Sequence, residues 1–231
     1  MNWFTTLYAW ACERLYAEFA GSYDRVSWLV SLGHWSDWRR AALHYLPLST
    51  MERGQGGEVS PPLRVLEIGF GTGELLLEMA RRGIEATGLE LSPAMHQVTA
   101  TKLRRQGCDV PRVRAFAQAM PLADESFDAI ISTFPAAYIL DPATLRECAR
   151  LLRKPQPAAN LPGGRLVILG LWVEIDQSFL RQLAPLFYGA PSPAFLSLCE
   201  SRLSAAGLKP TFTCYRTGSV NVSVVVAEWQ A

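Results

Sequence analysis

Short apolar runs alternate with amphipathic stretches from residue 64 to the end of the chain. An apolar run bounded by turn residues is typical of a strand that a sheet buries on both faces, and apolar positions three or four residues apart are typical of a helix packed on that sheet. The runs that predict strands are 64–69, 85–90, 113–118, 127–134, 164–172, 209–216 and 219–229. The stretches that predict helices are 72–82, 92–106, 141–152, 176–187 and 193–206.

Strands that alternate with helices predict a parallel sheet with helices on both faces. The last two strands differ, because only Thr217 and Gly218 separate them, and so short a connection joins antiparallel neighbours. We therefore expect an α/β fold, a Rossmann-like three-layer sandwich. Its seven-stranded sheet would be mostly parallel and end in a C-terminal antiparallel hairpin.

The region before the first strand is rich in aromatic residues and predicts a separate element. We expect a helical lid over residues 1–50, a linker over 51–62, which reads MERGQGGEVSPP, and the sheet domain over 63–231. Five tryptophans lie in the first 38 residues. They either shield an apolar acceptor, with some contact to a membrane surface, or pack the N-terminal helices onto the sheet.

Composition excludes several classes of protein. The chain has 231 residues, 49% of them hydrophobic, which is enough for a sizeable core. A net charge of +1 gives no reason to expect a nucleic-acid partner. The five cysteines include no CxxC pair, so we expect neither disulfides nor a metal site.

The apolar N-terminal stretch does not predict a membrane span or a secretory signal. Glu13, Arg14 and Glu18 interrupt it before the ~20 apolar residues that a span needs, and it lacks a positively charged start. We expect a cytoplasmic protein without a transmembrane segment.

A glycine-rich loop follows the first predicted strand and reads Glu67-Ile-Gly-Phe-Gly-Thr-Gly73. Glycines let the backbone turn tightly and let a ligand approach the amide groups. The dinucleotide fingerprint GxGxxG would require glycine at position 74, where this chain has Glu74. The Glu67 carboxylate would repel a pyrophosphate and favours a ligand that carries an ammonium group.

Glu90 lies at the end of the second predicted strand, seventeen positions beyond Gly73. An acidic residue at this place in a Rossmann-like unit accepts hydrogen bonds from ribose hydroxyls. The alternative interpretation is an exposed acid near a helix start. Together with the glycine loop, the ribose interpretation is favoured.

These residues resemble the class I S-adenosylmethionine-dependent methyltransferases. The first motif of that family matches residues 65–73, its ribose acid matches Glu90, and its adenine-binding segment is similar to 117–122, where Gln118 replaces an aspartate common in the family. The resemblance implies S-adenosylmethionine as cofactor. The residues that it implies at the cofactor site are Glu67, Gly69, Phe70, Gly71, Thr72, Gly73, Glu90, Leu91, Met95, Gln118, Ala119, Met120 and Thr133.

The N-terminal residues resemble one group within that family, the ubiquinone/menaquinone C-methyltransferases. The matching stretches are 19–26, 31–34, 38–40 and 88–95. One departure concerns the acceptor, because Ala137 stands where that group carries an arginine after its fourth strand. A fixed cation there would stabilise a developing phenolate, so we carry over the cofactor site and not the quinone substrate. The expected acceptor is a small apolar or aromatic molecule, with lipophilic molecules among the candidates.

Three residues are candidates for the methyl-transfer site. Tyr23 lies in the matched N-terminal stretch, and Tyr138 follows the fourth strand, where open α/β sheets bind their ligands. His34 is a candidate base near neutral pH. Each has a purely structural alternative: the tyrosines as packing residues, and the histidine as a residue hydrogen-bonded within the fold.

Other functions are consistent with parts of this pattern. A nicotinamide-dependent oxidoreductase would share the fold, but Glu67 and Glu74 argue against it. A base-modifying methyltransferase typically has Asn/Asp-Pro-Pro-Tyr after the fourth strand, where this chain has Thr133-Phe-Pro-Ala136. A phospholipid N-methyltransferase and a non-catalytic S-adenosylmethionine-binding protein remain as alternatives. The sequence indicates no particular oligomeric state.

Overall fold

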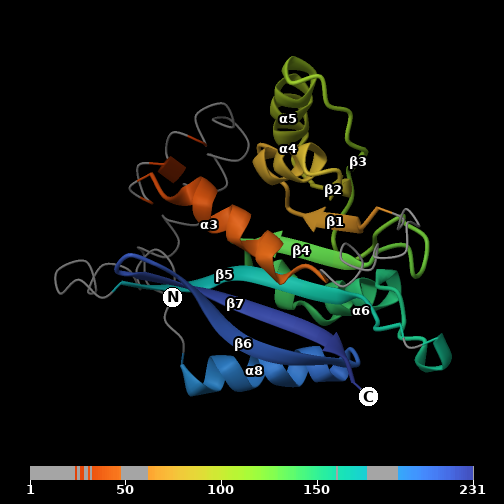
Figure 1. Ribbon diagram of the computed structural model, residues 1–231. Helices are drawn as coiled ribbons and strands as arrows, with labels where there is room; N and C mark the ends of the chain where they lie inside the picture. Colours follow the sequence, from red (N-terminus) through yellow and green to blue (C-terminus); the bar gives the residue numbers. More distant parts are fainter. Residues whose placement is uncertain are drawn as a thin grey trace.

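The computed structural model describes residues 24, 27–28, 31, 33–47, 62–159, 161–175 and 192–230. They form one seven-stranded sheet with helices on both faces (Figure 1). The strands are β1 (Arg64–Ile68), β2 (Glu85–Leu89), β3 (Arg112–Val113), β4 (Ala129–Thr133), β5 (Arg165–Ile175), β6 (Leu208–Thr217) and β7 (Val220–Trp229). The helices are α3 (Trp35–Ala41), α4 (Glu74–Arg81), α5 (Pro93–Arg105), α6 (Pro142–Leu151) and α8 (Pro193–Ala205), with short 3₁₀ turns η2 (Ala42–Tyr45), η4 (Ala137–Leu140) and η5 (Pro157–Ala159).

The strand order is β3-β2-β1-β4-β5-β7-β6. The first five strands pair in parallel, and β7 lies antiparallel between β5 and β6. This confirms the mostly parallel sheet with a C-terminal hairpin. The order reverses between β1 and β4, and ligands of open α/β sheets bind beyond the carboxyl ends of the strands at such a point.

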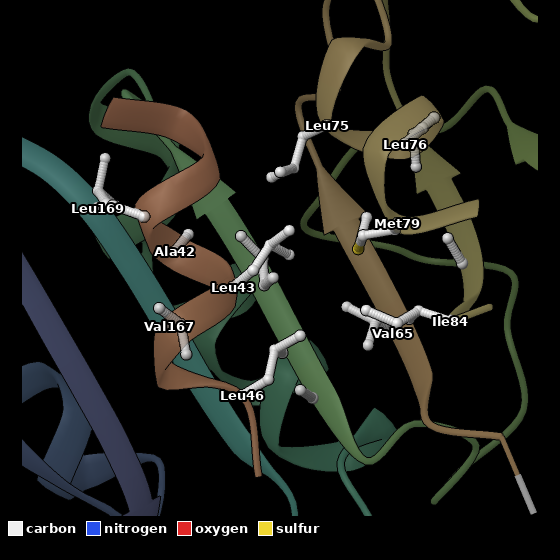
Figure 2. Packing of buried hydrophobic residues seen from close by; sticks show 14 of the residues in the cluster. Ala42, Leu43, Leu46, Val65, Leu75, Leu76, Met79, Ile84, Val167 and Leu169 are labelled. Atoms are coloured by element: carbon white, nitrogen blue, oxygen red, sulfur yellow. The ribbon is translucent and has the colours of Figure 1, made fainter. Parts of the chain in front are cut away.

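Two apolar clusters cover the two faces of the sheet. On one face, Leu43 of η2 and Met79 of α4 lie in one cluster with Val65 and Val167 (Figure 2). On the opposite face, α6 and α8 pack against the intervening residues of the strands. Because side chains alternate along a strand, Glu67 points to the same face as Val65, toward α3 and α4. This alternation decides the surroundings of that acid.

Local signals place the helix starts as expected. The Ser92 side chain accepts a hydrogen bond from the Met95 amide, and Pro93 is the first residue of α5. The Asp141 side chain caps α6 in the same way. Both arrangements satisfy amide groups that have no partner within the helix.

Two predicted boundaries are wrong. The strand expected over 113–118 is only two residues long, because β2 ends at Leu89 and gives the chain after Val113 no backbone to pair with. The helix expected from residue 72 begins at Glu74, because Gly73 adopts a left-handed backbone with φ +71°. The helix expected over 176–187 lies outside the described residues, and so does nearly all of the expected linker. No helix in the described part of the chain is long and apolar enough to cross a bilayer.

Candidate functional site

The glycine-rich loop connects β1 to α4 at the carboxyl end of the sheet. Its turn is fixed by two backbone hydrogen bonds, from Gly69 N to Leu89 O at 2.7 Å and from Gly73 N to Phe70 O at 2.9 Å. The Phe70 side chain is fully buried in the core, so only its backbone faces the loop. Gly71 has φ +54°, and a Cβ built on it meets no atom within 4 Å. The space that a side chain at Gly71 would enter is therefore filled by no atom of the described residues, although the Gly71 backbone is itself buried.

We expect Gly71→Ala to impair cofactor binding more than stability. The left-handed φ should cost about 1 kcal/mol of the free energy of unfolding, and the added methyl group should weaken S-adenosylhomocysteine binding about tenfold or more. Gly83→Ala is the matched control, because Gly83 has φ +72° and a Cβ built on it also meets no described atom within 4 Å, but it is exposed in the turn between α4 and β2. Equal affinities of the two variants in a calorimetric titration would contradict a ligand at Gly71.

Glu90 connects the glycine loop to the loop that follows β2. Its Oε2 accepts from Gly71 N at 3.2 Å, and its Oε1 accepts from Leu91 N at 2.8 Å and Ser92 N at 2.9 Å. These amides fix the carboxylate beside the backbone of Gly71. The Leu91 side chain is exposed next to it, whereas Met95 is fully buried and packs with Trp35. Leu91 can therefore contact a ligand with its side chain, but Met95 supports the site from within the core.

The segment expected to bind adenine is held in place by α6. The Met120 amide donates to Glu147 Oε2 at 2.8 Å, and Arg150 Nη2 donates to Met120 O at 2.9 Å. Hydrogen bonds from Arg150 lower the pKa of Glu147. The Gln118 side chain is half-buried, and Ala119 is exposed. Glu147 and Arg150 were not predicted at the site, although an acid and an arginine three residues apart on a helix commonly form an ion pair.

Glu67 lies in a fully buried ion pair. Arg39 of α3, itself only 4% exposed, places Nη2 2.9 Å from Glu67 Oε1. The same arginine donates from Nε to Thr133 Oγ1 at 3.0 Å and from Nη2 to Phe70 O at 3.3 Å. Arg39 thus joins α3 to the carboxyl ends of β1 and β4. Arg39 lies in the matched stretch 38–40 but was not among the residues predicted at the site, because an arginine between Trp38 and Arg40 on a helix gives no sign that it is buried.

The electrostatics of Glu67 are unusual for a carboxyl group. Burial above all, together with the negative charges of Glu90 and Glu74, raises its pKa to about 7 against the opposing charge and hydrogen bond of Arg39. Its Oε2 atom is buried without a hydrogen-bond partner in the described part of the chain. A buried acceptor in this state is costly unless a donor is supplied.

Tyr138 lies over the start of the glycine loop. Its hydroxyl would clash with a Cβ on Gly69, which only glycine avoids. Ser132 Oγ donates to Ile68 O at 2.9 Å beneath it. Burial raises the pKa of Tyr138 well above its usual range, so the hydroxyl keeps its proton at neutral pH. The structure thus places Tyr138 beside the cofactor loop.

Aromatic side chains gather where β4 ends beside the middle of β5. The ring of Phe134 stacks on Trp35 with centroids 4.3 Å apart and lies 6.1 Å from the ring of Trp38. On its other side Phe134 lies against Gly170, where any Cβ would clash with the ring. Phe134 has φ +49°, an uncommon value for a residue with a side chain, and such values concentrate at functional sites.

Of the other two catalytic candidates, the structure describes only His34. His34 is exposed, precedes α3, and stacks on Trp38 with ring centroids 6.2 Å apart. Tyr23 lies outside the described residues.

Thr72 is buried, and its hydroxyl donates to Asp24 Oδ1 at 2.6 Å, which attaches residue 24 to the glycine loop. Within the described ranges, no three His, Cys, Asp or Glu side chains are grouped as metal ligands would be.

The residues at this edge fit S-adenosylmethionine. The unpartnered Oε2 of Glu67 suits the ammonium group of its methionine part, and Glu90 presents a fixed carboxylate for the ribose hydroxyls. Gly71 lies between Glu67 and Glu90 in the sequence, and a Cβ built on it meets no described atom within 4 Å. Glu67 and Glu74 would both oppose the pyrophosphate of a dinucleotide.

Comparisons with known proteins agree with this assignment. The family model described as a methyltransferase domain matches residues 65–155. A demethylmenaquinone methyltransferase from Thermus thermophilus is 32% identical over 158 residues, which cover 67% of this chain and 63% of that protein. A demethylmenaquinone methyltransferase from Mycolicibacterium vanbaalenii is 31% identical over 193 residues, which cover 79% of this chain and 74% of that protein.

The chain therefore spans less than two thirds of the Thermus relative. Among solved structures, phosphoethanolamine N-methyltransferase 2 from Haemonchus contortus, in complex with S-adenosyl-L-methionine, superposes with a TM-score of 0.52. It is 13% identical, and the match covers 85% of this chain and 57% of that chain. At this identity the likeness shows the fold alone.

Proposed function

This chain belongs to the class I S-adenosylmethionine-dependent methyltransferases of the ubiquinone/menaquinone C-methyltransferase type, and we propose that it methylates a ring carbon of a quinol. The observation that carries the methyl-transfer part is the placement of Glu67 and Glu90 on either side of the glycine loop. One acid is buried with an acceptor atom that has no partner among the described residues, and the other is fixed by three amides. This arrangement suits a ligand that is an amino acid at one end and a nucleoside at the other.

The acceptor class is inferred from two observations. The relatives that match over most of this chain are named demethylmenaquinone methyltransferases. Phe134, directly after β4, stacks its ring on Trp35 of α3. Aromatic walls bind flat aromatic rings by stacking and exclude water.

The chemistry needs little from the protein beyond alignment. When bound, S-adenosylmethionine supplies an electrophilic methyl carbon. The ring carbon of the quinol would take this methyl group in exchange for its proton, which would pass to solvent, and S-adenosylhomocysteine would remain as the product. The residues of this chain hold the two reactants in line, which is worth many orders of magnitude in rate.

Position 137 sets a limit on how the phenolate of the acceptor is stabilised. Ala137 is exposed and opens η4, and it offers no cation. The reaction then depends on a quinol that is already electron-rich. This favours hydroquinones over simple phenols as substrates.

The proposal is tested with S-adenosylmethionine labelled with deuterium in its methyl group. The acceptors are a prenylated naphthoquinol without its ring methyl, a simple phenol, and phosphoethanolamine. We expect mass spectrometry to find the label on a ring carbon of the quinol. Phe134→Leu should lower kcat/KM for the quinol about tenfold while the Kd of the cofactor stays unchanged. Label on phosphoethanolamine and none on the quinol would overturn the acceptor class.

A further inference from the structure

Arg39 is the charged side chain of α3 that reaches deepest into the cofactor site. It contacts three separate parts of the carboxyl edge: the Glu67 carboxylate, the Thr133 hydroxyl and the Phe70 carbonyl. Both members of the ion pair are buried, with 5% of the Arg39 side chain and none of the Glu67 side chain exposed. Removing two charges from water is costly, so the pair persists only because these hydrogen bonds fix its geometry.

The two oxygens of Glu67 are not equivalent. Oε1 accepts from Arg39 Nη2, whereas Oε2 has no hydrogen-bond partner in the described part of the chain. A carboxylate held by one oxygen in a fixed orientation presents the other oxygen to a second cation. The second cation must be small, because Glu67 is fully buried.

We propose that Arg39 is a positioning residue for the cofactor, which holds Oε1 of Glu67 so that Oε2 receives the ammonium group of the methionine part. This inference rests on the proposed function. In the alternative role, Arg39 occupies the position of the ammonium group and must move away when the cofactor binds. Its bonds to Thr133 and Phe70 argue against this, since a group that leaves would break contacts with three elements at once.

The charges around Glu67 give the inference a pH signature. Arg39 from α3, Glu74 from α4, Glu90 after β2 and Tyr138 after β4 all act on Glu67 or are acted on by it. Burial raises the pKa of Glu67 to about 7, and binding of an ammonium group favours the ionised carboxylate. Cofactor affinity should therefore rise with pH up to about 7 and level off above it. Without Arg39 the pKa of Glu67 rises further, so the plateau should begin at higher pH.

The experiment compares S-adenosylhomocysteine with 5′-methylthioadenosine, which lacks the amino-acid part. Affinities are measured by calorimetry between about pH 6 and pH 8.5 for the wild type, Arg39→Met, Arg39→Lys and the control Arg40→Met. Arg40 is the neighbouring arginine, 43% exposed, with Asp37 and Glu74 at 3.7 and 4.0 Å. Arg40→Met should leave both affinities unchanged.

We expect Arg39→Met to weaken S-adenosylhomocysteine about tenfold or more, to leave methylthioadenosine within about twofold, and to shift the pH profile upward. Arg39→Lys keeps the charge but not the planar fork, so a smaller loss confined to S-adenosylhomocysteine is expected, and this variant decides the question if Arg39→Met does not fold. Equal or tighter S-adenosylhomocysteine binding by the Arg39 variants would overturn the inference, and so would an equal loss for both ligands. A wild type that binds neither ligand would instead overturn the proposed function.

Discussion

Replacing Glu90 with alanine is expected to lower the affinity for S-adenosylhomocysteine by about 100-fold or more. The variant loses the carboxylate that we propose as acceptor for the ribose hydroxyls, and hydrogen bonds to a charged group are among the stronger ones. It also releases the amides of Gly71, Leu91 and Ser92, which the carboxylate now holds at 2.8 to 3.2 Å. The loop that faces the ligand would lose its fixed shape along with the ribose contact.

Glu85→Ala is the matched control for this change. Glu85 is an exposed acid at the opposite end of the same strand, β2, so it removes the same charge without touching the loop. We expect its dissociation constant to equal that of the wild type in the same titration. If Glu90→Ala bound S-adenosylhomocysteine as tightly as Glu85→Ala does, Glu90 would not be a ribose ligand.

The second large effect concerns stability. Glu67→Leu should lower the free energy of unfolding by about 3 to 5 kcal/mol, because it leaves the Arg39 guanidinium buried without its partner. Arg39→Met should cost less at pH 6, because the Glu67 carboxyl can bind a proton and become neutral whereas arginine cannot lose one. The raised pKa of Glu67 is the reason for this asymmetry.

The double variant Glu67→Leu/Arg39→Met separates the charge effect from packing. It removes both charges, so urea unfolding should find it more stable than Glu67→Leu alone. If the double variant lost as much stability as the two single variants together, the ion pair itself would contribute nothing. In that case the cost would come from lost packing around α3.

The sequence predicted the order of strands and helices, since short apolar runs and capping residues such as Ser92 are local signals. It overestimated the third strand, because strand length depends on a neighbour to pair with, and that neighbour ends at Leu89. The glycines after the first strand and the acid after the second predicted a binding loop and Glu90, and the structure brings both to the same edge of the sheet.

Other features depended on contacts between distant parts of the chain. Arg39 and Glu67 are 28 residues apart, and no local pattern shows that an arginine of α3 is buried against a strand. The hydrogen bond from the Met120 amide to Glu147 of α6 likewise joins residues that are 27 positions apart, so no local pattern predicts it. Met95 and Phe70 match the family motif, but their side chains serve the core, and only the packing of the whole sheet reveals this.

The most direct test of the account is a calorimetric titration of the wild-type protein with S-adenosylhomocysteine and, separately, with NADH. We predict one molecule of S-adenosylhomocysteine bound per chain with a dissociation constant in the micromolar range, and no heat from NADH. Binding of NADH in preference to S-adenosylhomocysteine would contradict the assignment of Glu67 to an ammonium group and of this edge of the sheet to a methyl donor.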